Sequence, residues 1–290
     1  MLIKPQTTNF AKLRVLGVGG AGNNALNSMI SLSSIQGVDF VAINTDAQAL
    51  LMCQAATKIQ IGEQLTKGLG SGGDPEVGRQ AAEESIEKVK DILEGSDMVF
   101  LTAGMGGGTG SGSTPIIAKA AKEVGALTVA VITKPFAFEG TRRMVVAEDA
   151  VEEIKDKVDT LIVIPNQRIL DVVDKKLSLL DAFKVADSVL TQGVQGISDL
   201  ITMPGLINVD FADVRTIMNS SGSALMGIGS GVGENRAQTA ARTAIASPLL
   251  EISMEGARAV LFNIIGGPDL TMTEVDDAAK IIASAADPDA

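Results

Sequence analysis

The sequence predicts an α/β fold built on a parallel sheet, and three observations support that prediction. Between Leu13 and Pro165, short apolar runs alternate with segments of helical periodicity. Glycine-rich loops join several of these runs to the helices that follow them. A further helical segment, 178–201, has about 24 residues and a length of ~36 Å, enough to cross a domain. We therefore expect a larger Rossmann-like domain, a long connecting helix and a smaller α/β domain.

The strands are expected at apolar runs. In chain order these runs are 13–16, 40–43, 59–61, 97–101, 127–132 and 161–164. Parallel strands end at a common edge of the sheet, and α/β proteins bind their ligands at that edge. The glycine loops of this chain directly follow such strand ends, so we expect a ligand site there.

Helices are expected between the strands. One opens from the glycine loop 17–24 and continues to about Ile35. A second has Asp74 as N-cap and Pro75 at its first position, and Gly95 closes it. By the same logic Thr114 and Pro115 predict the start of a third helix. The remaining expected elements are a helix from Thr141, helices starting near Asp210, Glu234 and Thr273, and strands at 224–227 and 259–262.

Composition excludes several classes of function. The chain has 290 residues with one Cys and no His, which excludes an internal disulfide, a zinc site and a His-based catalytic triad. Its net charge of −11 argues against nucleic acid as a partner. No apolar stretch approaches the roughly 18 residues of a membrane span. With no secretory signal visible, we expect a cytoplasmic protein without direct membrane insertion.

The segment 104–113, Gly-Met-Gly-Gly-Gly-Thr-Gly-Ser-Gly-Ser, is the strongest candidate for a ligand site. Glycines let a backbone approach a phosphate closely, and unpaired N–H groups at a helix start bind anions. The alternative is a tight turn, but a turn needs only one or two glycines. Two further glycine loops, 17–24 and 68–73, also run into helices. Three such loops suit a nucleotide that carries several phosphates.

The chemistry at these loops has alternatives. Gly17, Gly19 and Gly22 fit the G-x-G-x-x-G pattern of NAD-binding proteins, and Asp46 follows at about the distance of the ribose-binding acid. Dehydrogenases, however, need a proton-handling residue, often His. No P-loop motif is present, so phosphate charge would be met by backbone N–H groups, helix dipoles and Mg²⁺ bound chiefly through the phosphates. A third alternative is a nucleotide-binding structural protein that assembles without turnover.

The segment 106–112, Gly-Gly-Gly-Thr-Gly-Ser-Gly, matches the GGGTG[ST]G signature of the tubulin superfamily. From about Lys12 to Ala290 the chain resembles the FtsZ family of bacterial cell-division GTPases within it. The resemblance implies a GTPase that uses GTP/GDP and Mg²⁺ and polymerises head to tail into filaments at the septal ring. It also implies a GTP-binding domain at 1–177, a connecting helix at 178–203 and an incomplete C-terminal activation domain at 204–290. Further strands, a linker and a tail that binds other division proteins would follow Ala290.

The resemblance also assigns nucleotide contacts to individual residues. It places the phosphates against Gly20, Ala21, Gly22, Asn23, Asn24, Gly107, Gly108, Thr109 and Gly110, and the γ-phosphate near Gly70, Ser71, Gly72 and Gly73. It assigns the sugar to Glu139 and Arg143, the base to Asn166 and Asp187, and base stacking to Phe183. The residues alone would make Asp187 a solvated charge. A buried carboxylate would nevertheless select guanine, whose paired N–H donors adenine lacks.

The last candidate site is the acidic segment around Asn208, Asp210 and Asp213. With Asp210 as N-cap, Asp213 falls at the third helical position, and ordinary capping worth about 1 kcal/mol explains both carboxylates. The resemblance instead implies that these three residues reach the nucleotide of the next subunit and polarise the attacking water. Hydrolysis would then require two copies of the chain.

Overall fold

The computed structural model describes residues 11–32, 35–172, 178–203, 205, 209–246, 254, 256–287 and 290. Within them, one seven-stranded sheet has the order β3-β2-β1-β4-β5-β6-β7, and every neighbouring pair is parallel. The strands are β1 Leu13–Val18, β2 Val38–Asn44, β3 Thr57–Gln60, β4 Met98–Gly104, β5 Leu127–Lys134, β6 Thr160–Pro165 and β7 Gly222–Ala224. The expected parallel sheet is confirmed.

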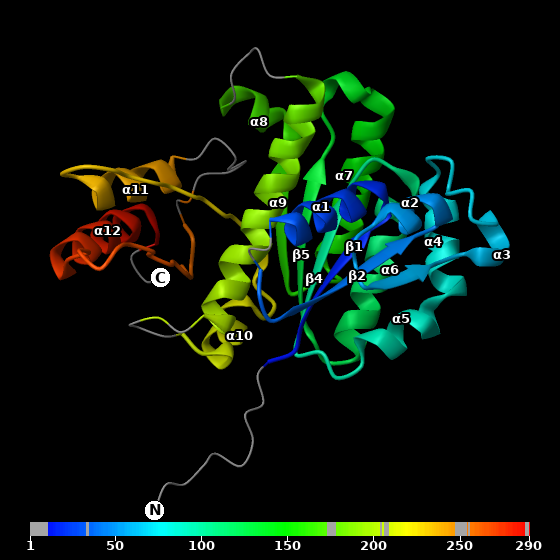
Figure 1. Ribbon diagram of the computed structural model, residues 1–290, viewed down its shortest axis with the longest axis horizontal. Helices are drawn as coiled ribbons and strands as arrows, with labels where there is room; N and C mark the ends of the chain where they lie inside the picture. Colours follow the sequence, from blue (N-terminus) through cyan, green and yellow to red (C-terminus); the bar gives the residue numbers. More distant parts are fainter. Residues whose placement is uncertain are drawn as a thin grey trace, which may run out of the picture.

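The central strands are buried on both faces, which explains why they are continuous apolar runs. In β4, Met98 and Phe100 point into one core, whereas Val99 and Leu101 point into the other. Two helical layers cover these faces (Figure 1). The first contains α1 Gly19–Ser31, α2 Ala47–Met52, α9 Leu179–Thr202 and α10 Phe211–Met218, and the second contains α4 Pro75–Glu84, α5 Ile86–Leu93, α6 Gly108–Glu123 and α7 Thr141–Lys155.

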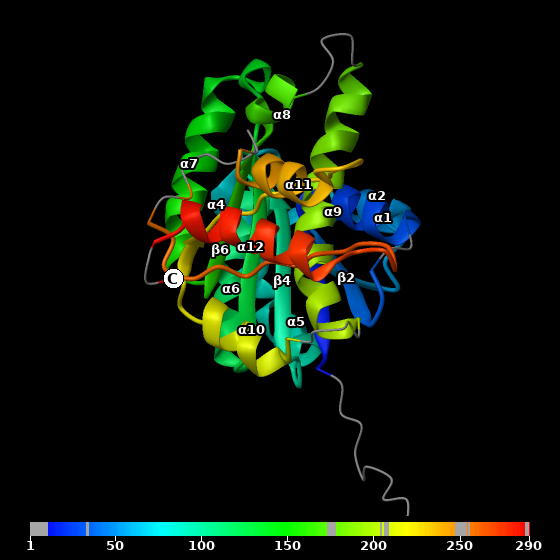
Figure 2. The same cartoon turned by 90° about the vertical axis from the view of Figure 1, so that its left-hand side faces the viewer.

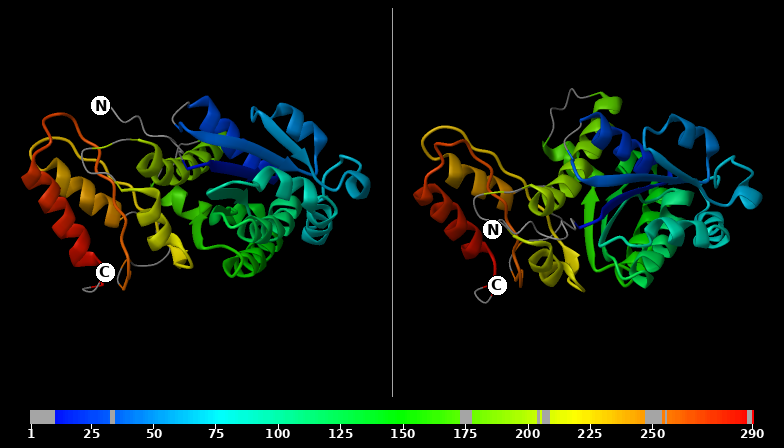
Figure 3. Two further views of the ribbon diagram at one scale, coloured as in Figure 1. Left: turned by 90° about the horizontal axis from the view of Figure 1, so that it is seen from below. Right: turned by 60° about the horizontal axis from the view of Figure 1, so that its bottom comes forward.

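The long helix α9 confirms the expected connecting helix. It has 24 residues, and the Ser178 side chain caps it by accepting a hydrogen bond from the Asp181 N–H. Beyond it, α11 Arg236–Ile245 and α12 Met272–Ala285 pack side by side on the far side of α9 from the sheet (Figures 1 and 2). Seen from below, this pair lies at one side of the molecule, with α10 nearer to the sheet (Figure 3).

The start of α6 differs from the expectation. The helix begins at Gly108, with Gly107 as N-cap, and Pro115 lies inside it. A proline in a helix interior leaves one carbonyl without its usual N–H partner, a cost that this helix tolerates. The side chain of Thr114 points back along the helix, and its hydroxyl donates to the carbonyl of Gly110. Most of the glycine signature is therefore helical.

Other boundaries also differ. The helix expected over 74–95 is two helices, because the backbone turns at Ser85, whose hydroxyl accepts a hydrogen bond from the Gly62 N–H at 3.1 Å. The strand expected at 224–227 is β7, Gly222–Ala224, and it joins the main sheet beside β6. No strand forms at 259–262, since no neighbouring segment of the described chain pairs with it. Four short helical segments of the described chain were not predicted: α2, α3 Glu63–Thr66, the 3₁₀ helix Ala137–Glu139 and α8 Asn166–Val172.

None of the helices that the structure describes is long and apolar enough to cross a membrane.

Candidate functional site

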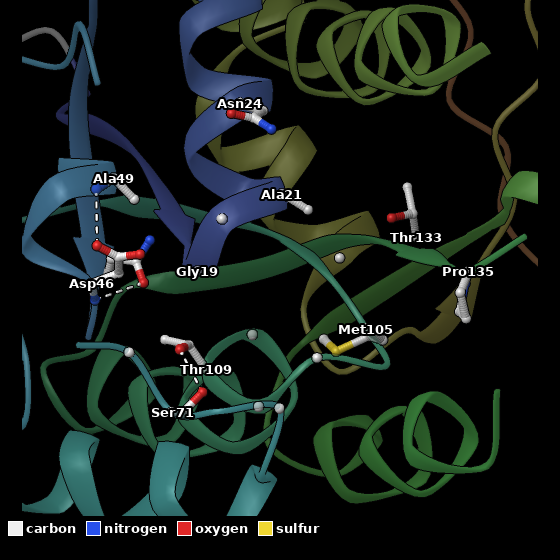
Figure 4. Close-up of a pocket in the computed structure, with 18 of the residues that line it drawn as sticks. Gly19, Ala21, Asn24, Asp46, Ala49, Ser71, Met105, Thr109, Thr133 and Pro135 are labelled. Atoms are coloured by element: carbon white, nitrogen blue, oxygen red, sulfur yellow. Dashed lines mark hydrogen bonds between the residues drawn. The ribbon is translucent and has the colours of Figure 1, made fainter. Parts of the chain in front are cut away.

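A pocket of about 620 Å³ lies at the carboxyl edge of the sheet. Its centre is between β1 and β4, where the strand order reverses, the usual ligand position in open α/β sheets. The loops after β1, β2 and β4 and the start of α6 all contribute to it (Figure 4). Its volume is within the ordinary range for small-molecule sites. The sequence therefore predicted the correct edge of the sheet.

Two helices begin in this pocket without a side-chain cap. They are α1, with Val18 as N-cap, and α6, with Gly107 as N-cap. By contrast, the neighbouring helices α2 and α4 are capped by the carboxylates of Asp46 and Asp74. First-turn N–H groups that no side chain caps are donors for an anion, and the helix dipoles favour negative charge there. The pocket is thus built to receive phosphate.

The glycines of the site have two distinct roles. A Cβ added at Gly20 or Gly107 would meet nothing within 4 Å, so these positions leave the pocket open. Gly110 and Gly112 face the protein instead. A Cβ at Gly112 would lie 1.9 Å from the carbonyl oxygen of Pro75 on α4, and one at Gly110 would lie 2.6 Å from that of Gly104. Part of the signature therefore serves helix packing beneath the pocket.

Hydroxyl groups join three segments of the pocket floor. The side chain of Thr109, at the start of α6, hydrogen-bonds the Thr45 hydroxyl at 2.7 Å. It also hydrogen-bonds the Ser71 hydroxyl at 3.0 Å (Figure 4). Thr45 follows β2, and Ser71 lies in the glycine loop 68–73. In that loop Gly72 and Gly73 have positive φ angles of 60° and 79°, which glycine adopts without strain. Thr109 therefore ties a conformationally permissive loop to the floor.

Gly22 and Asn23, predicted as phosphate contacts, lie below the pocket and do not line it. A Cβ at Gly22 would be 2.5 Å from the carbonyl oxygen of Thr102, so this glycine packs α1 against β4. Asn23 is buried, donates to the Gly17 carbonyl at 2.8 Å and accepts from Asn44 Nδ2 at 2.8 Å. In the structure both residues support the loop from beneath the pocket, and their contact with phosphate stays a prediction.

The other wall of the pocket has the features of a base site. Phe183 is part-exposed there and meets Phe136 edge to face at a centroid distance of 5.3 Å. Asn166 is buried, and its Oδ1 has no hydrogen-bond partner in the structure. Buried polar atoms are normally paired, so this oxygen is a candidate to accept from a ligand. Asp187 lies beside them, and burial raises the pKa of its carboxyl to about 6.

Glu139 and Arg143 form an ion pair at the edge of the pocket. The other carboxylate oxygen of Glu139 accepts a hydrogen bond from the Phe136 N–H at 2.9 Å. Among the residues that the structure describes, the charged side chains that line the pocket are Asp46, Glu139, Arg143 and Asp187. Because three of these four are acidic, a triphosphate would depend on backbone N–H groups and a cation rather than on lysine or arginine.

All the predicted contacts except Gly22 and Asn23 line this pocket. They are Gly20, Ala21, Asn24, Gly70, Ser71, Gly72, Gly73, Gly107, Gly108, Thr109, Gly110, Glu139, Arg143, Asn166, Phe183 and Asp187. The sequence analysis missed Asn44, Thr45 and Thr133, which also line it, whereas Met105 lies in the predicted segment 104–113. Asn44 ends β2 and Thr45 follows it at the carboxyl edge, and that position was the signal that should have identified them.

The acidic pair Asp210 and Asp213 lies elsewhere. Both side chains are exposed at the start of α10, and neither lines the pocket. Asn208, expected to act with them, lies outside the residues that the structure describes. Figure 1 shows α10 at the end of the sheet opposite to α8, whose first residue, Asn166, lines the pocket.

Comparisons with known proteins agree with this fold and site. The model of the tubulin/FtsZ family, GTPase domain, matches residues 12–174, and that of the FtsZ family, C-terminal domain, matches residues 222–290. The W319Y mutant of M. jannaschii FtsZ is 48% identical, with a TM-score of 0.92 over 97% of this chain and 84% of that one. An empty FtsZ dimer from M. jannaschii gives the same identity and TM-score over 97% and 82%.

CetZ2 from Haloferax volcanii, solved as a GTPγS-bound protofilament, is 21% identical with a TM-score of 0.78 over 94% of this chain and 85% of that one. At this identity the match shows the shared fold alone.

The sheet, the uncapped helix starts and the matched models define a guanine-nucleotide-binding GTPase of the tubulin-like class. The chain belongs to the tubulin/FtsZ family and has the C-terminal domain of the FtsZ branch. The expectation of an FtsZ-type GTPase with a role in cell division is confirmed at this level.

Proposed function

We propose that this chain binds GTP at the carboxyl edge of its sheet and hydrolyses it only when a second copy supplies Asp210 and Asp213. Successive copies would stack head to tail into a filament. One observation carries the proposal: the nucleotide pocket and the acidic pair lie at opposite ends of the same sheet. A single chain cannot bring them together without unfolding that sheet.

The position of α10 follows from its contacts with the amino ends of the strands. Thr160, the first residue of β6, donates a hydrogen bond to the Met218 carbonyl at 2.7 Å. Arg215 Nη2 donates to the carbonyl of Gly125, just before β5, at 3.2 Å. The seven residues of β4 then span the sheet at ~3.3 Å each, which separates α10 from the pocket by roughly 20 Å.

In the pocket, the phosphates would lie across the first turns of α1 and α6, with Ser71, Gly72 and Gly73 closing over the terminal phosphate. The guanine would stack on Phe183, with Asp187 accepting from its paired N–H donors and Asn166 Oδ1 gaining a partner. Glu139 and Arg143 would contact the sugar. Two observations support these roles: the space around Gly20 and Gly107 is open, and the buried Asn166 Oδ1 has no hydrogen-bond partner in the structure.

Mg²⁺ fits this pocket as a partner of the nucleotide. No cluster of three metal-ligating side chains occurs in the described part of the chain, so the protein would hold the ion through few groups. Asp46 and the hydroxyls of Ser71 and Thr109 line the pocket and are oxygen ligands of the kind that Mg²⁺ takes. When bound, the ion would neutralise charge on the phosphate oxygens.

The carboxylates of Asp210 and Asp213 would orient and polarise the water that attacks the γ-phosphate on the adjacent copy, with Asn208 beside them. Association of the related M. jannaschii FtsZ as a dimer supports such stacking. We further propose the domain division 1–177, 178–203 and 204–290, a cytoplasmic location at the septal ring, and contacts with other division proteins through a C-terminal tail. The matched C-terminal model beginning at residue 222 supports a separate second domain.

The test is the concentration dependence of GTP hydrolysis. Phosphate release per molecule is expected to start near zero and to rise once the protein concentration passes an assembly threshold, while GTP binding stays constant. An enzyme whose site lies within one chain would show the same specific activity throughout. A flat profile would therefore refute hydrolysis in trans.

Complementation gives a matched control. Asp213→Asn removes the acidic half of the site, and Gly20→Val adds a side chain to the pocket at a position where an added Cβ meets nothing within 4 Å. Neither variant should hydrolyse GTP alone, whereas their mixture should recover part of the parent activity. A mixture as inactive as its components, although the variants co-assemble, would contradict the proposal.

A further inference from the structure

The geometry points to Thr160 as a positioning residue that holds the acidic pair, Asp210 and Asp213, at the angle needed to reach the nucleotide of the adjacent copy. This inference rests on the proposed hydrolysis in trans. Thr160 begins β6 at the amino edge of the sheet, is fully buried and does not line the pocket. It would therefore act through α10 rather than on the nucleotide.

The Thr160 hydroxyl joins β6 to the end of α10 through two hydrogen bonds. It donates to the Met218 carbonyl at 2.7 Å and, because its single proton is used there, accepts from the Ser221 hydroxyl at 2.8 Å. Met218 is the last residue of α10, and Ser221 lies between α10 and β7. One buried side chain thus connects a strand of the sheet to the helix that carries the acidic pair.

The turn between α10 and β7 has a restricted backbone. Ser220 has a φ angle of 55°, which is uncommon for a residue other than glycine. Such a conformation persists only where the surrounding structure holds it. The Gly222 N–H donates to the Asp159 carbonyl at 3.0 Å, and the Thr160 hydroxyl bonds residues on both sides of Ser220. The end of α10 is therefore held in one conformation.

Apolar packing alone would not set the angle of α10. Val214 and Met218 are buried against the sheet, but hydrophobic contacts have no preferred direction, whereas hydrogen bonds do. The helix has eight residues and is ~12 Å long, so a tilt of about 10° at its end would move its first turn by about 2 Å. Even a 1 Å misplacement caused by a distant mutation can slow a reaction by about 10²-fold.

Strand β6 reaches the nucleotide pocket at its other end. It runs from Thr160 to Pro165 and leads directly into Asn166, which lines the pocket. Within each copy, β6 therefore fixes the separation between the pocket and the helix that carries the acidic pair. Because each acidic pair would act on the pocket of the next copy, every site along a filament would have the same geometry.

The test measures GTP hydrolysis per subunit in fully assembled filaments of Thr160→Val at saturating GTP. Valine keeps the approximate shape of threonine but lacks the hydroxyl. Turnover is expected to fall about tenfold or more, with GTP affinity and the assembly threshold unchanged. Thr160→Ser, which keeps the hydroxyl, should retain the parent turnover. Ser221→Ala removes only the second hydrogen bond and should show a smaller loss.

Thr128→Val is the matched control. Thr128 is also fully buried near the start of a strand, β5, but its hydroxyl donates within its own segment, to the Ala126 carbonyl at 3.1 Å. This variant should keep the parent turnover. An equal loss in Thr128→Val and Thr160→Val would overturn the inference, as would parent-like turnover in Thr160→Val.

Mixtures of variants show which half of the shared site is affected. Thr160→Val keeps an intact pocket, so Gly20→Val, which keeps an intact acidic pair, should restore activity when the two are mixed. Mixing Thr160→Val with Asp213→Asn should give no more activity than Thr160→Val alone, since neither chain then has a correctly placed acidic pair. A deficit of the same size in both mixtures would show a general structural defect and overturn the inference.

The mixture of Asp213→Asn with Gly20→Val is the reference for these experiments. If it recovers activity and Thr160→Val behaves like the parent, only the inference about Thr160 fails. If the reference mixture recovers no activity although its variants co-assemble, the proposed hydrolysis in trans is itself wrong.

Discussion

Asp210 and Asp213 cap each other across the first turn of α10. The Asp213 N–H donates to Asp210 Oδ1 at 2.9 Å, and the Asp210 N–H donates to Asp213 Oδ2 at 3.4 Å. The longer bond is the weaker one, so Asp213 contributes less to the cap than Asp210 does. Both carboxylates also remain exposed, and capping therefore does not exclude a catalytic role. A variant at Asp213 can distinguish the capping role from the catalytic role.

Asp213→Asn should abolish most hydrolysis and leave folding and GTP affinity intact. The amide keeps an oxygen for the cap but loses the basic carboxylate, and removal of a positioned general base typically slows a reaction by about 10²–10⁴-fold. Phosphate release, the GTP dissociation constant and the unfolding midpoint measure the three properties. Turnover within a few-fold of the parent would leave capping as the only role of this residue.

GTP affinity should fall as the pH decreases through about 6. Burial raises the pKa of Asp187 to about 6, and only its ionised form accepts both N–H donors of guanine. The contact is therefore complete above that pH and is lost progressively below it. The terminal phosphate of GTP titrates in a similar range. Asp187→Asn provides the control for the phosphate, and the same pH profile in both proteins would exclude Asp187 as the titrating group.

Without nucleotide, Asp187 should destabilise the protein at neutral pH. Its folded pKa is raised above the ordinary value of 3.8, so folding penalises the ionised form. That penalty is absent below about pH 4, develops between the two pKa values and is complete above about 6. Asp187→Asn should therefore raise the melting temperature at pH 8 and have little effect at pH 4. An equal change at both pH values would indicate altered packing instead.

Two glycine substitutions should separate packing from ligand binding. Gly112→Ala places a methyl group 1.9 Å from the Pro75 carbonyl oxygen and should cost about 1–3 kcal/mol or more of unfolding free energy. Gly107→Ala meets nothing within 4 Å and has a φ of −97°, which alanine adopts freely. It should preserve stability and weaken nucleotide binding. Chemical denaturation and GTP titration distinguish the two, and identical effects would contradict this division.

Much of the site was predictable because its signals are local. The apolar runs of the central strands, the glycine loops after them and the helical periodicity of 178–201 are properties of short segments. Strand ends in a parallel sheet share one edge, so the position of the pocket followed from the order of the elements. The roles of Asp187 and Asn166 came instead from the family resemblance. No local pattern distinguishes a buried carboxylate from a solvated one.

The sequence by itself thus determined the sheet, the edge of the sheet where the pocket lies and the glycine-rich loops that line the pocket. The tertiary structure alone decided which glycines face the pocket, since α4 packs against Gly112 and nothing packs against Gly107. It also decided that Asn23 lies beneath the pocket and that β7 joins the main sheet. The physical reason is common to all of them. Hydrogen bonds and packing between segments distant in the chain depend on how complete elements fit together, and periodicity within one segment contains no information about that fit.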